Sequence, residues 1–138
     1  MNHTVYLGLG TNLGDKEGNI REAVRRIGEL IGTVECQSTL LVSEPWGFES
    51  ENTFVNAAIR CSTELEPMEV LVRTQEIERA MGRTQKSVDG QYHDRIIDID
   101  ILMYDNLHID TKTLKLPHPL MNERDFVMIP LEEVLIDN

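Results

Sequence analysis

The spacing of apolar residues divides the chain into alternating strands and helices. Residues 3–9 alternate between apolar and other positions, which predicts a strand with one buried face. Apolar residues then recur at helical spacing between residues 20 and 31, which predicts an amphipathic helix. Asp15 is placed to cap the start of this helix, and Gly32 is placed to end it.

Two further strands and a second helix follow. Residues 34–43 and 54–62 are rich in β-branched and apolar side chains, which predicts a strand in each segment. The segment between them, 44–53, contains proline and glycine and is predicted to be a loop. Pro67 suits the first turn of a helix that ends near Gly82.

The last third of the chain begins with a polar loop and supplies the final strand of the predicted order of strands and helices. Residues 82–95 have almost no apolar content, and loops of this length inside a compact domain are uncommon and often functional. Residues 96–104 form the strongest strand pattern of the chain, and a short hairpin-like stretch and a mixed helical tail follow. The order β-α-β-β-α-β predicts an α+β, ferredoxin-like fold, with helices packed on the sheet and additional C-terminal elements. We expect the other face of the sheet to be available for loops or a ligand.

Length and composition narrow the possible functions. A chain of 138 residues predicts a single domain, 1–138, and no apolar run approaches the ~20 residues of a membrane span. Thirteen Lys and Arg against 24 Asp and Glu give a net charge of −11, which argues against a nucleic-acid binder. A phosphorylated ligand stays possible, because local basic residues and divalent cations can reverse the sign of the charge inside a cleft. We expect Cys36 and Cys61 to be reduced thiols in a cytoplasmic protein.

The main chemical signal is an acidic pair in the sequence Ile-Asp-Ile-Asp-Ile at 97–101. On a strand the isoleucines enter the core, while Asp98 and Asp100 point together to the opposite side, with Cα atoms roughly 6.5–7 Å apart. Carboxylates without nearby cysteines suit Mg²⁺, and such a pair can flank two ions ~3.5–4 Å apart, as in phosphoryl transfer. The alternative, a solvated face of an amphipathic strand, stays open on this pattern alone.

Basic side chains surround the acidic pair in the sequence. Arg83, Lys86 and Arg95 lie in or beside the polar loop that precedes it, and His118 and Arg124 follow it. Arginine offers paired donors to phosphate oxygens and lysine a mobile point charge, so the set resembles a pocket for a metal-bound triphosphate. Each of these residues, taken singly, also fits a solvated surface cation.

Two other motifs leave alternatives open. The glycine-rich segment 8–14 lacks the ending of a P-loop and misses the Rossmann spacing, so it predicts a tight strand-to-helix turn. Phe54 and Phe126 can enclose a flat heterocycle while Asn56 recognises its edge, or the two rings can simply belong to the core.

Ordered blocks run along nearly the whole chain and include Gly-Thr-Asn-Leu at 10–13, Pro-Trp-Gly at 45–47, Phe-Val-Asn-Ala-Ala at 54–58, Arg-x-x-Asp-x-Asp-Ile-Leu at 95–102 and Pro-His-Pro at 117–119. Together these blocks resemble the hydroxymethyl-dihydropterin pyrophosphokinases of folate biosynthesis. The resemblance implies an Mg²⁺-dependent enzyme that transfers pyrophosphate from ATP to the hydroxymethyl group of a reduced pterin and releases AMP. We expect a monomer that acts on these small molecules and not on nucleic acid or membranes.

The resemblance also implies a role for individual residues. Asp98 and Asp100 match a pair that holds two Mg²⁺ ions, and the catalytic set is completed by Arg83, Lys86 and Arg95. The residues implied to contact ATP are Gln75, Glu78, Lys86, Arg95, Ile101, His118 and Arg124. The residues implied to contact the pterin are Ser43, Trp46, Phe54, Asn56, Asp98 and Phe126.

Two other functions are weighed against this one. A nucleotidyltransferase places a Gly-Ser turn shortly before its Asp-x-Asp strand, whereas here the glycine-rich turn and the acidic pair are about 85 residues apart. A non-catalytic ferredoxin-like binding domain does not need an acidic pair with cations around it. The products of the reaction and Mg²⁺-dependent ATP binding distinguish these two alternatives from a pyrophosphokinase.

Overall fold

The computed structural model describes residues 2–43, 53–82, 96–119 and 121–135. Its elements in chain order are β1 (His3–Thr11), α1 (Lys16–Leu30), β2 (Gly32–Gln37), β3 (Leu41–Ser43), β4 (Phe54–Thr63), α2 (Pro67–Ala80), β5 (Asp98–Tyr104), β6 (Ile109–Asp110), β7 (Lys115–Leu116), the short 3₁₀ helix η2 (Met121–Glu123) and α3 (Asp125–Val134). The loops predicted for 44–53 and 82–95 lie almost entirely outside the described residues.

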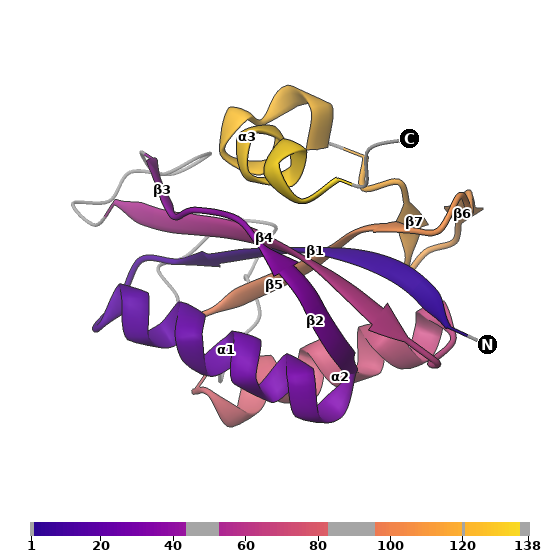
Figure 1. Cartoon of the computed structure of the whole chain (residues 1–138), viewed down its shortest axis with the longest axis horizontal. Helices are drawn as coiled ribbons and strands as arrows, with labels where there is room; N and C mark the ends of the chain where they lie inside the picture. The colour runs from indigo at the N-terminus through magenta and orange to yellow at the C-terminus, as the bar shows by residue number, and fades with distance from the viewer. Residues whose placement is uncertain (1, 44–52, 83–95, 120, 136–138) are drawn as a thin grey trace.

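An antiparallel sheet separates two layers of helices. Its strands follow the order β2-β4-β1-β5, and β3 pairs with β4 beyond the end of β2. Figure 1 shows α1 and α2 on one face of the sheet and α3 on the other. β6 and β7 form a separate hairpin that contacts β5. The fold is therefore a mixed α/β arrangement with one helical layer on each side of an antiparallel sheet.

Apolar side chains are buried on both faces of the sheet. The larger cluster lies between the sheet and helices α1 and α2, and it includes Val5, Leu7, Leu9, Ile27, Ile59, Ile77, Ile97, Ile99 and Ile101. The smaller cluster lies under α3 and contains Tyr6, Ala58, Leu102, Met121, Leu131 and Val134. The expectation of an uncovered second face is therefore only partly met, because α3 covers some of it.

Most helix boundaries predicted from the sequence agree with the structure. Asp15 caps α1 as predicted, since its Oδ1 accepts from the Gly18 backbone N–H at 3.1 Å. α1 ends at Leu30 with Ile31 as its C-cap, directly before Gly32 as predicted, but Gly32 begins β2 without the positive φ of a typical helix-ending glycine. A Cβ on Gly32 would lie 2.0 Å from the Ser62 carbonyl oxygen, so the close approach of β4 requires glycine there.

The single strand predicted for 34–43 is divided in the structure. The Ser38 backbone N–H donates to the Ala58 carbonyl oxygen at 2.9 Å, and the Ser38 Oγ accepts from the Ala58 N–H at 2.9 Å. A side chain thus replaces one backbone acceptor and interrupts the regular pairing with β4. The second part, β3, resumes at Leu41 and pairs with the beginning of β4.

The two cysteines are free thiols, as the sequence predicts. Cys61 is buried against α1 and α2, whereas Cys36 is half-buried against the cluster under α3. Burial, with a contribution from Glu35, raises the pKa of the Cys61 thiol to about 11, so this thiol stays protonated at neutral pH.

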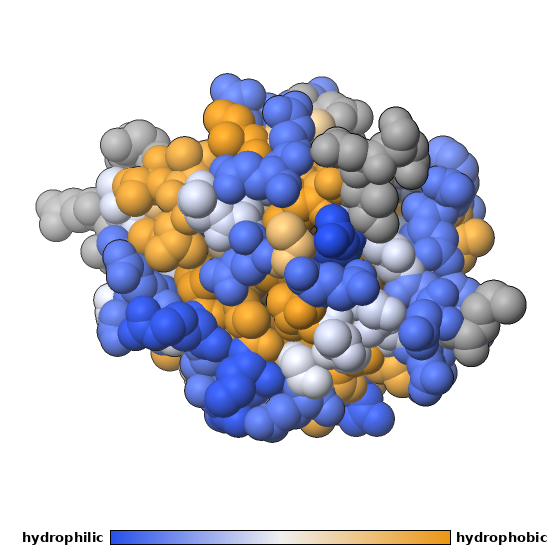
Figure 2. Space-filling view, viewed as in Figure 1, coloured by the Kyte–Doolittle hydropathy of each residue, from blue (hydrophilic) through white to orange (hydrophobic). Residues whose placement is uncertain are grey.

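The charged surface of α1 is paired within the helix. The most hydrophilic colour in Figure 2 gathers at the lower left, over α1. There Arg25 forms ion pairs with Glu22 and Glu29 at 2.6 Å, and Arg26 contacts Glu22 at 2.7 Å. Within the described ranges, no helix has both the length and the hydropathy needed to cross a bilayer.

Candidate active site

The acidic pair lies on the sheet face opposite α1 and α2. Ile97, Ile99 and Ile101 are at most 5% exposed in the larger core cluster, whereas Asp98 and Asp100 are half-buried. Because side chains alternate along a strand, the two carboxylates share one side of β5. This part of the sequence prediction is confirmed.

The alternation on β5 ends at a β-bulge. Leu7 pairs with Ile101 and Tyr6 pairs with Met103, which leaves Leu102 as an extra residue on β5. Leu102 and Met103 both pack into the cluster under α3. The acidic part of the face therefore stops where the apolar contacts with α3 begin.

Two glycines of β1 lie between the acidic pair and β4. Gly10 pairs with Asp98 on one side and Asn56 on the other, and Gly8 pairs with Asp100. Opposed residues of antiparallel strands point to the same face, and neighbouring strands are about 4.8 Å apart. Two such spacings place the Cα atoms of Asp98 and Asn56 roughly 10 Å apart, across backbone that carries no side chain. We call Gly8 and Gly10 the glycine floor.

The glycine floor was not predicted, because the glycine-rich segment 8–14 by itself predicts only a tight strand-to-helix turn. The available signal was the Gly-x-Gly spacing inside a predicted strand, which has the same period of two as the Asp-x-Asp motif. That period places both glycines on one face, but the identity of the neighbouring strands is needed to place them beside the acidic pair.

Ser43, Phe54 and Asn56 meet at the β4 side of the floor. Asn56 is only 4% exposed, and its Nδ2 donates to the Leu41 carbonyl at 3.1 Å and to the Ser43 Oγ at 2.7 Å. The Asn56 Oδ1 is turned toward Gly10, where an added Cβ would lie 3.3 Å from this oxygen and 3.7 Å from the Phe54 Cδ1. The amide is thus held in one orientation, with its oxygen beside the floor.

Arg124 and Phe126 belong to the layer above this face. Arg124 occupies the N-cap position of α3 and is 7% exposed, and Phe126 is half-buried in the first turn. The guanidinium carbon lies 5.8 Å from the centre of the Phe126 ring, within the range of a cation–π contact. α3 contacts β1, β2, β3 and β4, so it brings both residues to the sheet face that carries the acidic pair.

A pocket of about 270 Å³ opens at the β5 edge of the sheet. It is lined by Leu71, Ile99, Asp100, Ile101, Lys112, Thr113, Leu114, Lys115, His118 and Pro119. Two residues that the resemblance implies for ATP, Ile101 and His118, line it together with Asp100. Lys112 and Lys115 were not among the predicted site residues, and the structure adds them through the β6–β7 hairpin.

Three other described residues implied for ATP, namely Arg124, Gln75 and Glu78, do not line this pocket. Gln75 is exposed on α2. Glu78 is 7% exposed, and its Oε2 accepts from the Ile99 backbone N–H at 2.8 Å. Glu78 therefore supports the open edge of β5 between the two aspartates.

The environment of His118 favours its neutral form. Burial is the largest cause that lowers its pKa, the positive charge of Arg124 adds to it, and Asp98 acts in the opposite direction. His118 also lies beside β5 through its backbone, since its N–H donates to the Leu102 carbonyl at 2.9 Å. A neutral imidazole can donate one hydrogen bond and accept another at neutral pH.

The lowered pKa of His118 predicts a pH-dependent stability. As pH falls below the ordinary value of 6.5, the unfolded chain binds a proton that the folded chain resists, so the free energy of unfolding decreases. We expect urea unfolding at pH 8 and pH 5.5 to show a larger loss for the unaltered protein than for His118→Gln. The exposed His108, replaced in the same way, is the control. Parallel losses in the unaltered protein and His118→Gln would contradict this prediction.

The acidic pair fits Mg²⁺ in its chemistry. Within the described part of the chain, no group of three or more His, Cys, Asp or Glu residues is arranged to hold a metal ion. Mg²⁺ does not need such a cage, because it usually takes one or two carboxylates and completes its shell with water and substrate phosphates. Asp98 and Asp100 are half-buried and match that requirement. Gly10 lies beside Asp98, whereas the Leu102 side chain lies over Gly8 beside Asp100.

Four residues of the predicted site, Trp46, Arg83, Lys86 and Arg95, lie outside the described residues. Their roles stay predictions.

Comparison with known proteins shows similarity over nearly the whole chain. A sequence model of the 7,8-dihydro-6-hydroxymethylpterin-pyrophosphokinase (HPPK) family matches residues 6–136. A protein of Porphyromonas gingivalis named 2-amino-4-hydroxy-6-hydroxymethyldihydropteridine pyrophosphokinase is 47% identical over 131 residues, which cover 94% of this chain and 89% of the relative. A Bacillus subtilis protein of the same name is 38% identical over 135 residues, which cover 97% and 79%.

Solved structures share the fold. An HPPK-DHPS protein in complex with substrates gives a TM-score of 0.75 at 14% identity, and the match covers 96% of this chain. Plasmodium falciparum HPPK-DHPS with pteroate gives a TM-score of 0.74 at 16% identity. The chain spans 40% and 39% of the length of these two proteins, respectively.

The fold and the sequence comparisons together define a transferase of folate biosynthesis. The family match covers most of the chain, and several relatives are more than 35% identical to it. The chain belongs to the 7,8-dihydro-6-hydroxymethylpterin-pyrophosphokinase family. This result confirms the resemblance seen in the sequence motifs.

Proposed function

We propose that this chain transfers pyrophosphate from ATP to the hydroxymethyl group of 6-hydroxymethyl-7,8-dihydropterin and releases AMP. Membership of the family supports the reaction. The observation that carries the location of the site is the row Asp98, Gly10 and Asn56 across three neighbouring strands. This row supports the proposal, because a carboxylate suited to a cation and an amide suited to the edge of a ring lie on opposite sides of Gly10.

The pterin site is formed around the β4 side of the glycine floor. The Asn56 Oδ1 accepts from the edge of the ring, because Leu41 and Ser43 already occupy its Nδ2. Phe54 lies beside the floor, and Phe126 comes from α3, so the two rings contribute apolar contact to a flat heterocycle. The remaining proposed contacts are Ser43, Trp46 and Asp98.

The ATP site extends from the acidic pair to the pocket at the β5 edge. Ile101 and His118 line that pocket, and Lys112 adds positive charge at its β6–β7 side, where Lys115 is paired with Asp110 at 3.1 Å. The other proposed contacts are Gln75, Glu78, Lys86, Arg95 and Arg124. Two Mg²⁺ ions, held by Asp98 and Asp100, would neutralise the charge of the triphosphate.

The reaction itself requires mainly alignment. The hydroxymethyl oxygen loses its proton to water and forms a bond to the β-phosphorus, as the bond from that phosphorus to the oxygen that leaves with AMP breaks. The glycine floor and Asn56 orient the ring, and well-aligned reactants gain roughly 7–11 kcal/mol from positioning. Arg83, Lys86 and Arg95 donate to phosphate oxygens on which charge develops.

We also propose a ferredoxin-like fold, a single domain, a monomeric state and a cytoplasmic location. The order β1-α1-β2-β4-α2-β5 and the strand order β2-β4-β1-β5 support a ferredoxin-like classification. We propose one domain, 1–138, that acts as a monomer on small molecules. ATP as the co-substrate and the two free thiols, Cys36 and Cys61, favour a cytoplasmic location.

The test is the product of a reaction that contains ATP, the reduced hydroxymethyl pterin and Mg²⁺. We expect one AMP for each pterin consumed, and no reaction after a chelator removes the metal. Release of free pyrophosphate would support a nucleotidyltransferase and contradict the proposal. If calorimetry detects no Mg²⁺-dependent binding of a non-hydrolysable ATP analogue, a non-catalytic binding domain is favoured.

A further inference from the structure

The proposed ring site takes its side chains from two separate parts of the chain. Ser43 and Asn56 come from β3 and β4, whereas Phe126 comes from α3. A flat ring fits between these two walls only if the spacing between them is maintained. The contacts that join α3 to β3 therefore bear directly on recognition of the ring.

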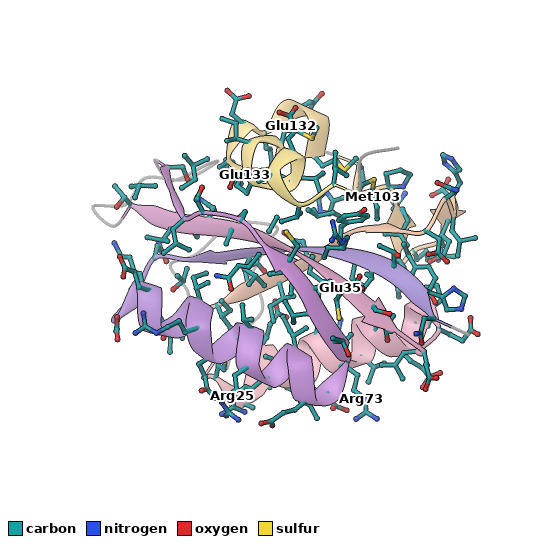
Figure 3. All side chains as sticks on the ribbon, in the orientation of Figure 1. Arg25, Glu35, Arg73, Met103, Glu132 and Glu133 are labelled. Atoms are coloured by element: carbon teal, nitrogen blue, oxygen red, sulfur yellow. The ribbon has the colours of Figure 1, made fainter. Side chains whose placement is uncertain are left out.

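A carboxylate of α3 connects this helix to the segment that precedes β3. The Glu133 Oε1 accepts from the Thr39 backbone N–H at 2.9 Å and from the Thr39 hydroxyl at 3.0 Å, and the Glu133 Oε2 lies 2.9 Å from the same hydroxyl. Figure 3 shows Glu133 on the side of α3 toward the sheet, while the neighbouring Glu132 lies on the far side. We call this contact the Thr39–Glu133 clamp.

The strand that the clamp supports is short. β3 has three residues and pairs with β4, and Thr39 lies two residues before it. Isolated short strands have little stability of their own. The position of β3, and of Ser43 within it, thus depends on β4 on one side and on the segment held by Glu133 at its beginning.

The other contacts of α3 include one polar anchor and an adaptable apolar surface. The Arg60 Nη1 donates to the Val134 carbonyl at 2.7 Å, which ties the end of α3 to β4. The apolar cluster beneath the helix includes Met103, Met121 and Met128, whose flexible side chains tolerate small shifts. Apolar contacts are non-directional, so the directional polar contacts at the end of α3 add to the packing of Leu131 and Val134 in fixing the position of the helix.

We propose that Glu133 is a positioning residue for the ring substrate. Through Thr39 it fixes the spacing between β3, which carries Ser43, and α3, which carries Phe126. The pocket at the β5 edge is built from α2, β5 and the segment that contains β6 and β7, and neither partner of the clamp lines it. The effect is therefore expected on the pterin more than on ATP. This inference rests on the proposed function.

The test compares Glu133→Ala and Glu133→Gln with the matched control Glu132→Ala, all in the full chain. Glu133 and Glu132 are both exposed on α3, so each alanine variant removes one surface charge from the same helix. We expect Glu133→Ala to raise the KM of the pterin by about 3- to 10-fold, the usual scale for one or two hydrogen bonds. The KM of ATP should change by less than about twofold, a change too small for the loss of a hydrogen bond. Glu133→Gln keeps an acceptor for Thr39 and should restore most of the pterin affinity, whereas Glu132→Ala should change neither constant.

Several outcomes would overturn the positioning role. They are an unchanged KM of the pterin in Glu133→Ala, an equal rise in the KM of ATP, and the same rise in Glu132→Ala. A lower thermal midpoint with both KM values unchanged would make the clamp a stability contact only. If the unaltered protein releases no AMP, the proposed function fails instead, and equilibrium binding of the pterin to the same variants then decides the role of Glu133.

Discussion

Asp98→Asn and Asp100→Asn each lower kcat by about 10²- to 10³-fold, the loss typical for one group that stabilises developing charge. Asparagine keeps the size of the side chain but removes the negative oxygen that Mg²⁺ prefers. The cation can then no longer be held tightly beside the triphosphate. The measurement is the rate of AMP release at saturating ATP and pterin over a series of Mg²⁺ concentrations.

The fold is expected to survive both changes. Asp98 and Asp100 are half-buried on the open face of β5, and the isoleucines between and beside them retain their core contacts. The thermal midpoint should therefore stay close to that of the unaltered protein. Asp15→Asn is a matched control, because it makes the same chemical change at the start of α1, where asparagine caps a helix about as well as aspartate. Turnover close to normal in either site variant would contradict the metal role of the pair.

Asn56→Ala is expected to raise the KM of the pterin by about 30- to 100-fold and to leave the KM of ATP nearly unchanged. A buried polar contact to a ligand is typically worth about 2–3 kcal/mol when its loss leaves the partner unsatisfied. Asn56 is 4% exposed, and its Oδ1 is held beside Gly10 by the two bonds of its Nδ2. The measurement is steady-state kinetics with each substrate varied in turn.

The variant Ser43→Ala tests how far recognition of the ring depends on the orientation of the Asn56 amide. This variant removes the 2.7 Å hydrogen bond that the Asn56 Nδ2 donates to Ser43 and leaves the bond to the Leu41 carbonyl in place. We expect a rise in the KM of the pterin of about 3- to 5-fold, close to the net worth of one neutral hydrogen bond. Equal effects of Asn56→Ala on both substrates would show that the residue supports the sheet and does not recognise the ring.

Local patterns predicted most of the secondary structure because each element is defined by neighbours in the sequence. The alternation at 97–101 placed three isoleucines in the core and two aspartates outside, and the structure agrees. Pro67 begins α2 as predicted, and Gly82 follows the helix with a φ of +106°. What local patterns did not predict are contacts between strands, namely the close approach of Ser62 to Gly32 and the bonds between Ser38 and Ala58 that divide the strand predicted for 34–43.

The candidate site was predictable in its residue types but not in its shape. The motifs indicated a cation-binding pair, an amide and aromatic rings. They did not indicate that Gly10 lies between Asp98 and Asn56, because that depends on the register of three strands that are far apart in the sequence. The contribution of Lys112 and Lys115 also appears only when the hairpin is placed beside β5.

The sequence by itself determined the family, the order of the main elements and the common orientation of the two aspartates, because motif order and residue periodicity are local properties of the chain. Only the tertiary structure decided which residues face one another across the sheet, how α3 is joined to β3, and where the pocket opens. Strand register and helix docking arise from packing between distant segments, and no local pattern specifies them.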